Sequence, residues 1–424
     1  MQANQLKQLL RDGALNQYRD LYTDPDRQAA RMIAAIDAFT AKYGEDRDIS
    51  LFSVPGRSEI CGNHTDHNHG CVLAAAIDRD IIAVASPNED GVIRFQSQGY
   101  SEDRVDLSRI DDPAHFRSFT SCALVAGVAR GFERAGHAIG GYDAYSTTEV
   151  LKGSGISSSA AFEVMVGNIM NYFYNDGKVP NAEIAKIAQY SENVFFGKPC
   201  GLMDQTACAV GGFVFIDFEH PETPVIDPIP FSLTSAGYAL CIVNTGGNHA
   251  NLNDDYASVP AEMKSVAAAF GKEVLRGLTE NDLIARAAEL RRELNDRAVL
   301  RAFHFIREND RVQQARDALR AGDTATFLTK IRESGDSSFK YLQNVYTTIN
   351  PKEQGLSLAL CVTETLLRGK GGAWRVHGGG FAGTIQVFVK NEYAEEYCRQ
   401  MNAVFGEGAA MNLRIRPVGA TRLM

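Results

Sequence analysis

A glycine- and serine-rich stretch stands directly before an apolar helical pattern in the middle of the chain. It reads Lys-Gly-Ser-Gly-Ile-Ser-Ser-Ser-Ala-Ala from Lys152 to Ala161. From Phe162 to Phe173, apolar residues recur at three- and four-residue spacing, which predicts a buried helix. A β-rich run over 142–149 comes just before. This order of strand, loop and helix predicts a mixed α and β fold in which the loop meets a helix N-terminus.

The composition of this loop suits a bound oxyanion. Glycine allows backbone conformations in which amide groups converge on one point. A helix N-terminus leaves N–H groups without partners and carries partial positive charge. Serine hydroxyls add donors and can also bind magnesium. We therefore predict a phosphate cradle for a nucleotide, made by Gly153, Ser154, Gly155, Ser157, Ser158 and Ser159.

Three other interpretations of the loop were weighed. Gly-Ser-Gly before a serine N-cap is also an ordinary start for a buried helix, and the loop alone favours neither reading. A Rossmann turn needs an acidic residue at the end of a second strand, but the candidate, Asp176, lies in an Asn-Asp-Gly turn signal. A Walker loop is absent, because no Gly-Lys pair is followed by Ser or Thr.

Composition narrows the class of protein. The 424 residues are 45% hydrophobic and 22% charged, which is typical of a globular protein with room for two domains. The net charge of −9 argues against a nucleic-acid or anionic-membrane partner. No apolar run reaches membrane-spanning length, and the polar N-terminus does not resemble a signal peptide. Eight cysteines without a C-x-x-C pair predict reduced thiols and a cytoplasmic location, while the oligomeric state is left open.

We expect two α+β domains, divided within the proline-rich segment 220–230. The N-terminal domain is predicted over 1–219 and the C-terminal domain over 220–424. Strands are predicted over 49–54, ending at Pro55-Gly56, and over 81–86, 92–96, 142–149, 211–218, 238–244, 373–377, 384–390 and 413–417. Helices are predicted within 1–46 and over 116–135, 181–196 and 392–405, and 257–368 is mostly helical.

The segment 55–70 is dense in groups that hydrogen-bond hydroxyls. It follows a predicted strand and contains His64, Asp66, His67 and His69. Such side chains can instead ligate a transition metal. We favour polyol binding over a metal, and a purely structural loop with solvated histidines is the remaining interpretation.

Two carboxylates elsewhere call for partners. Glu192 lies on the core-facing stripe of its predicted helix, where an unpaired charge is costly, so either magnesium or an ion pair is expected there. Asp204 lies among small and apolar residues, as a helix cap or a general base would. Arg57 could keep Asp204 ionised. With the glycine-rich segment 375–383, these groups describe phosphoryl transfer to a hydroxyl.

These motifs resemble those of the GHMP kinase superfamily, and within it the galactokinases, over nearly the whole chain. The resemblance implies an N-terminal domain like ribosomal protein S5, a ferredoxin-like C-terminal domain, and ATP between them. The matching segments are Pro55–Arg57 with Gly62–Asp66, Gly153–Ala160, Gly197–Gln205 and Gly378–Gly383.

The resemblance also implies the reaction and the residue roles. It implies Mg²⁺-dependent transfer of the γ-phosphate of ATP to the anomeric hydroxyl of galactose, giving α-galactose 1-phosphate. The roles are Asp204 and Arg57 for catalysis, Asn63, His64, Asp66 and Tyr256 for the sugar, Ser159 and Glu192 for magnesium, and Gly379 and Gly380 beside the phosphate loop for the nucleotide.

The sugar-reading loop departs from the family pattern. Asn63 stands where galactokinases have glutamate, His67 where they have tyrosine, and Glu59 where they have asparagine. The family's glutamate accepts from the sugar's 6-hydroxyl, whereas asparagine brings no negative charge and would tolerate a uronate. Galactose is the expected substrate, with galacturonate or N-acetylgalactosamine as alternatives. A non-catalytic sugar and ATP sensor on the same fold is a further alternative, against which the retained Glu192 and Asp204 argue.

Overall fold

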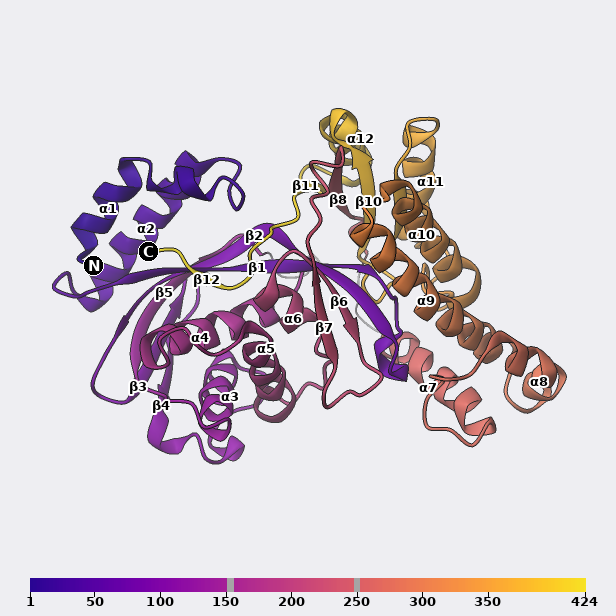
Figure 1. Ribbon diagram of the computed structural model, residues 1–424, viewed down its shortest axis with the longest axis horizontal. Coiled ribbons are helices and arrows are strands. Elements are labelled where there is room, and N and C mark those ends of the chain that lie inside the picture. Colours follow the sequence, from indigo (N-terminus) through magenta and orange to yellow (C-terminus); the bar gives the residue numbers. More distant parts are fainter. Residues whose placement is uncertain (151–155, 248–251) are drawn as a thin grey trace.

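The computed structural model describes residues 1–150, 156–247 and 252–424. Its strands form one eight-stranded and one four-stranded sheet, with helices packed on both. Figure 1 shows the larger sheet with the N-terminal half of the chain, and the smaller sheet beside the long C-terminal helices. The mixed α+β fold with two sheets agrees with the prediction. No helix among the described residues is both long and apolar enough to span a bilayer.

The larger sheet is built around a long antiparallel pair, β1 and β2. Its order is β12-β1-β2-β5-β3-β4, and β6 pairs with β2 and β7 with β6. The bounds are β1 Ser50–Cys61, β2 Cys71–Pro87, β3 Val92–Ser97, β4 Asp103–Asp106, β5 Tyr142–Thr148, β6 Phe213–Asp217, β7 Val225–Ile229 and β12 Thr421–Arg422.

Alternation along β1 and β2 divides the core of this sheet into two layers. Leu51 and its partner Val84 join the cluster that contains the N-terminal helices, whereas Phe52 and Ala83 join the main cluster on the other face. This is the period of two that a sheet covered on both faces requires. The helices are α1 Ala3–Arg11 and α2 Pro25–Tyr43 on one face, and α3 Ser121–Arg134, α4 Ser158–Tyr174, α5 Asn181–Tyr190 and α6 Met203–Val210 on the other.

The smaller sheet is antiparallel, in the order β11-β8-β10-β9. Helices α11 and α12 pack on it, and α10 contacts β9. The bounds are β8 Tyr238–Asn244, β9 Ala373–His377, β10 Thr384–Lys390 and β11 Ala410–Leu413, with α7 Asn253–Ala269, α8 Glu280–Glu293, α9 Asp296–Arg320, α10 Thr324–Ser337, α11 Gly355–Leu367 and α12 Ala394–Phe405.

The first strand does not end at Pro55-Gly56 as predicted, but continues to Cys61. Its pairing with β2 shifts register between Pro55 and Arg57, and again between Glu59 and Cys61. A proline without an N–H is tolerated at such an irregularity. The backbone N–H of Arg57 donates to the carbonyl of Ile156, 3.1 Å away, which ties the strand to the start of α4.

The C-terminal tail also differs from expectation. No strand spans 413–417, because β11 ends at Leu413 and the chain then returns to the larger sheet, where β12 pairs with β1. Strand β7 lies within the proline-rich segment, and its Pro228 is tolerated because β7 pairs only with β6, at the edge. The division at 219/220 stays a prediction, and both sides of it supply strands to the larger sheet.

Candidate active site

A bidentate ion pair and one serine hydroxyl join three elements at the centre of the site. Arg57 on β1 donates from Nε to Oδ1 of Asp204 (2.7 Å) and from Nη2 to Oδ2 (2.6 Å). Asp204 lies in the first turn of α6, near its positive end. The hydroxyl of Ser157, just before α4, donates to Oδ2 of the same carboxylate at 2.6 Å. The structure therefore brings the two predicted catalytic residues together and adds Ser157 to them.

The surroundings keep Asp204 ionised. Burial alone would raise its pKa, but the charge and hydrogen bonds of Arg57, with the Ser157 hydroxyl, outweigh burial and lower the pKa below its ordinary value. The Asp204 side chain remains 30% exposed, so a substrate hydroxyl can reach it. A paired but accessible carboxylate of this kind can orient a hydroxyl and accept its proton.

Ser157 does not cap α4 in the expected way. Its backbone is left-handed (φ 59°), and its side chain makes no capping hydrogen bond with the described part of the helix. Non-glycine residues adopt this conformation only where the surroundings enforce it. Here the conformation accompanies the hydrogen bond that the hydroxyl donates to Asp204.

Glu192 is buried and already has partners. It lies in the π-helical turn Ser191–Phe196 that follows α5. Its Oε1 is 3.2 Å from Nζ of Lys198, and its Oε2 accepts from Nε2 of Gln205 at 2.9 Å. The ion pair that we weighed against magnesium is thus present. Lys198 is 58% exposed, so its side chain has room to move away.

Glu163 is a second buried carboxylate here, which the sequence analysis missed. It accepts from the same Gln205 Nε2 at 3.2 Å, and its Oε1 has no hydrogen-bond partner among the described residues. Burial, with the negative charge of Glu192, raises the pKa of Glu163 well above its ordinary value. The available signal was its position four residues after Ser159, on the same face of one helix.

The oxygen atoms gathered here fit magnesium. Glu192, Glu163 and Gln205 bring two carboxyl groups and one amide together, and Ser159, in the first turn of α4, lies one helical turn before Glu163. Magnesium prefers such hard oxygen ligands. The predicted cradle residues Ser158 and Ser159 are half-buried in the first turn of α4, whereas Gly153, Ser154 and Gly155 lie outside the described residues.

Three of the predicted sugar residues converge on the glycine-rich loop between β9 and β10. Asn63 Nδ2 donates to the carbonyl of Gly378 (2.6 Å), His64 Nε2 lies 2.9 Å from the carbonyl of Gly379, and the Tyr256 hydroxyl donates to Gly380 at 2.9 Å. Burial lowers the pKa of His64 to about 4, so the ring is neutral at pH 7 and its Nε2 carries the proton.

Asp66, the fourth predicted sugar residue, contacts a different segment. Its side chain is half-buried and approaches Gly201, in the segment that precedes Asp204. Asp66 and His67 line a cavity of about 310 Å³ together with Cys200, Gly201 and Leu202. No group of three histidine, cysteine or carboxylate side chains is arranged to hold a metal ion in the described part of the chain.

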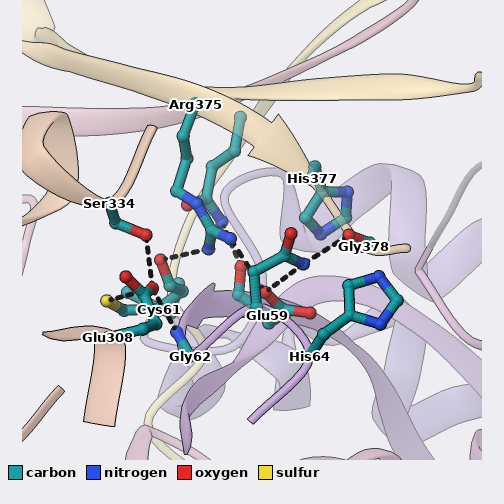
Figure 2. A network of polar contacts seen from close by, with 12 residues as sticks. Glu59, Cys61, Gly62, His64, Glu308, Ser334, Arg375, His377 and Gly378 are labelled. Carbon is teal, nitrogen blue, oxygen red and sulfur yellow. Dashed lines mark hydrogen bonds and ion pairs between the residues drawn. The ribbon is translucent and has the colours of Figure 1, made fainter. Parts of the chain in front are cut away.

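A buried polar network packs against the segment 59–64, which contains Asn63 and His64 (Figure 2). Arg375 Nη2 is 3.0 Å from Glu59 Oε1, and the same oxygen accepts from Asn63 Nδ2 at 3.2 Å. On the other side of the network, Glu308 accepts from the backbone N–H of Gly62 at 3.1 Å. The sequence assigned none of these roles, because Glu59 was noted only as a departure and Glu308 lies on α9, 246 residues further along.

Two family models match the chain. The galactokinase galactose-binding signature matches residues 37–87, and the N-terminal domain of GHMP kinases matches residues 123–212. The first range contains Arg57 and Asn63–Asp66, and the second contains Ser157–Ser159, Glu192 and Asp204.

Curated relatives match over most of their length. The galactokinase of Streptomyces coelicolor is 33% identical over 359 residues, 84% of this chain and 88% of that protein. The galactokinase of Actinobacillus pleuropneumoniae serotype 3 is 34% identical over 371 residues, 86% of this chain and 91% of that protein.

Solved structures share the fold. Lactococcus lactis galactokinase, crystallised with galactose, has a TM-score of 0.77 at 22% identity and covers 93% of this chain and 100% of its own. A mevalonate kinase has a TM-score of 0.59 at 14% identity, with 86% and 98% covered. With the identity to curated galactokinases and the Arg57–Asp204 pair in place, the chain belongs to the galactokinase family of the GHMP kinases.

Proposed function

We propose that this protein transfers the γ-phosphoryl group of ATP to the anomeric hydroxyl of galactose, giving α-galactose 1-phosphate. The observation that carries the proposal is Asp204, which Arg57 holds ionised and which stays accessible to a hydroxyl. The match of residues 37–87 to the galactose-binding signature supports galactose as the sugar.

Asp204 and Arg57 divide the work at the reacting hydroxyl. Asp204 accepts a hydrogen bond from the anomeric hydroxyl of the sugar. This hydrogen bond directs the hydroxyl oxygen toward the γ-phosphorus. Because its pKa is lowered, Asp204 is a weak base, and it takes the proton only as the new O–P bond forms and the hydroxyl becomes acidic. Arg57 keeps Asp204 ionised until then and stabilises negative charge on the transferring group.

The nucleotide side is formed by the serines of the cradle and the second glycine loop. We assign phosphate contacts to Gly153, Ser154, Gly155, Ser157, Ser158, Gly379 and Gly380. Ser159 and Glu192 would hold magnesium, which when bound neutralises charge on the phosphates. Lys198, which here neutralises Glu192, can then turn to the phosphate oxygens because its side chain is largely exposed.

On the sugar side, we assign hydroxyl contacts to His64, Asp66 and Tyr256. Because Nε2 of the neutral His64 ring donates to the Gly379 carbonyl, its Nδ1 remains as an acceptor for a sugar hydroxyl. The two carboxyl oxygens of Asp66 can accept from two adjacent hydroxyls. Asn63 belongs to the same loop.

A sugar panel tests this function directly. ADP release is measured with ATP, Mg²⁺ and galactose, galacturonate, N-acetylgalactosamine or glucose, and the product is identified by phosphorus and proton NMR. We expect the highest kcat/KM with galactose and an α-1-phosphate product. Preference for galacturonate would overturn the sugar assignment. Binding of sugar and ATP without turnover would instead identify a sensor.

A further inference from the structure

Side chains from distant parts of the chain bind three consecutive carbonyls of the glycine loop. Gly378 accepts from Asn63 and Gly380 from Tyr256. The carbonyl of Gly379 is bound twice, by His64 Nε2 and by Asn344 Nδ2 at 3.0 Å. We call Asn63, His64, Tyr256 and Asn344 the carbonyl clamp. Asn344 was not predicted from the sequence, and it is completely buried.

The two asparagines of the clamp also bind each other. Asn344 Nδ2 donates to Asn63 Oδ1 at 2.6 Å. The orientation of both amides follows from their partners, because a peptide carbonyl can only accept, so the group facing Gly378 or Gly379 must be the NH₂. The backbone carbonyl of Asn344 in turn accepts from the N–H of Phe381, at the end of the loop.

These contacts use the hydrogen-bonding groups of Asn63. Its NH₂ donates to Gly378 and to Glu59, and its Oδ1 accepts from Asn344. The residue is 1% exposed. A sugar hydroxyl would have to displace one of these buried partners to reach the amide, and a buried polar group left without a partner is unfavourable.

The clamp also determines where the loop's N–H groups point. In a planar trans peptide, the carbonyl of one residue and the N–H of the next point in opposite directions. The carbonyls of Gly378 and Gly379 point toward the clamp. The N–H groups of Gly379 and Gly380 therefore point away from the clamp. Neither N–H has a hydrogen-bond acceptor among the described residues.

We infer that Asn63 and Asn344 are positioning residues, which hold the glycine loop so that the N–H groups of Gly379 and Gly380 face an oxygen of the bound substrates. Asn63 is not itself a sugar ligand. This role rests on the proposed galactose kinase activity and assigns to the asparagine pair the preorganisation of one side of the site.

The neighbouring Glu59 explains why residue 63 is an amide here. A carboxylate at this position would face Glu59 Oε1 and the Gly378 carbonyl, both of which only accept, at the present 3.2 and 2.6 Å. Compared with the family pattern, asparagine and glutamate are exchanged between positions 59 and 63. The two substitutions therefore depend on each other.

The test compares Asn63→Ala, Asn344→Ala and the double variant on galactose and on its 2-, 3-, 4- and 6-deoxy derivatives. We expect kcat/KM to fall by about 10–100-fold, by the same factor on every sugar, because the loop and not one hydroxyl contact is disturbed. The double variant should be no worse than the worse single variant, because both act on one unit. Asn16→Ala, at an exposed asparagine, is the matched control.

A second measurement needs no substrate. Amide hydrogen exchange of residues 378–383 should be faster in each single variant than in the parent protein or in Asn16→Ala. If Asn63→Ala does not fold, Asn344→Ala carries the same test. A loss that disappears on one deoxy sugar would make Asn63 a ligand of that hydroxyl and overturn the inference, as would unchanged exchange. Absence of galactose turnover by the parent protein would count against the proposed function alone.

Discussion

Two buried networks of arginine and carboxylate tie the C-terminal part of the chain to β1 and β2, and they differ in balance. In the first, Asp80 on β2 meets two arginines, Arg31 from α2 at 2.7 Å and Arg416 from the tail at 3.3 Å. In the second, Glu59 on β1 has an ion pair with one arginine among the described residues, Arg375, at 3.0 Å. We call them the scaffold network and the loop network.

The pKa values of the two carboxylates move in opposite directions. Burial would raise the pKa of Asp80, but Arg31 and Arg416 outweigh it and the pKa is lowered. Burial raises the pKa of Glu59, and Arg375 only partly offsets this. Asp80, which is paired with two arginines, therefore stabilises the fold, whereas Glu59, which is paired with one, orients Asn63 beside the proposed sugar site.

Disruption of the scaffold network should cause the largest loss of stability. Asp80→Asn leaves the buried Arg416 without a carboxylate partner among the described residues and leaves Arg31 with only Glu149, at 3.4 Å, so we expect the free energy of unfolding to fall by about 3–5 kcal/mol. Urea unfolding measures this. The kcat per folded molecule should be unchanged, and a large loss of kcat without loss of stability would break the distinction between the networks.

The catalytic pair should show the reverse pattern. Asp204→Asn keeps the shape but removes the charge that orients the hydroxyl, so we expect kcat to fall by about 10²–10⁴-fold. Chemical denaturation should show a smaller loss of stability than in Asp80→Asn, because the Asp204 side chain is 30% exposed whereas that of Asp80 is 1% exposed. Near-full kcat in this variant would show that Asp204 does not have the assigned role.

The stability of the fold at acid pH should depend on Glu308. Its carboxylate accepts from the backbone N–H of Gly62 and so supports the loop network. Burial would raise its pKa, but Arg311, His304 and Arg375 outweigh burial and lower it to about 2. A lowered pKa stabilises the fold above the unfolded value near 4.5, and this contribution is lost as pH falls from about 4.5 toward 2. Glu308→Gln should reduce the slope of unfolding free energy against pH in that window, while above pH 6 the slope stays as in the parent protein.

The smallest effect concerns the exchange of residues between positions 59 and 63. Asn63→Glu alone places two carboxylates together, and we expect roughly a tenfold loss of kcat/KM. Glu59→Asn with Asn63→Glu restores one carboxylate and one amide and should recover most of that loss. A double variant no better than the single would show that the two positions are independent, measured in the same galactose assay.

Local pattern was enough for much of the fold. The helix after the glycine-serine loop, the strands around 142–149 and 384–390, and the glycine turn before Thr384 lie close to their predicted positions. These elements depend on periodicity and turn residues, which are local. The extension of β1 past Pro55 was missed because a register shift accommodates the proline, and a register shift depends on the partner strand.

The residue types in the motifs were enough to predict the chemistry, whereas the packing of distant segments selects the atoms that this chemistry can use. Motif residues such as Arg57 and Asp204 were recognisable because phosphoryl transfer needs those groups, and their pairing across 147 residues was a natural expectation. The hydrogen bonds of the Asn63 amide with Gly378, 315 residues away, and with Asn344 could not be expected in this way. Such contacts depend on how distant segments pack, and no local pattern records which hydrogen bonds of a buried side chain are already made.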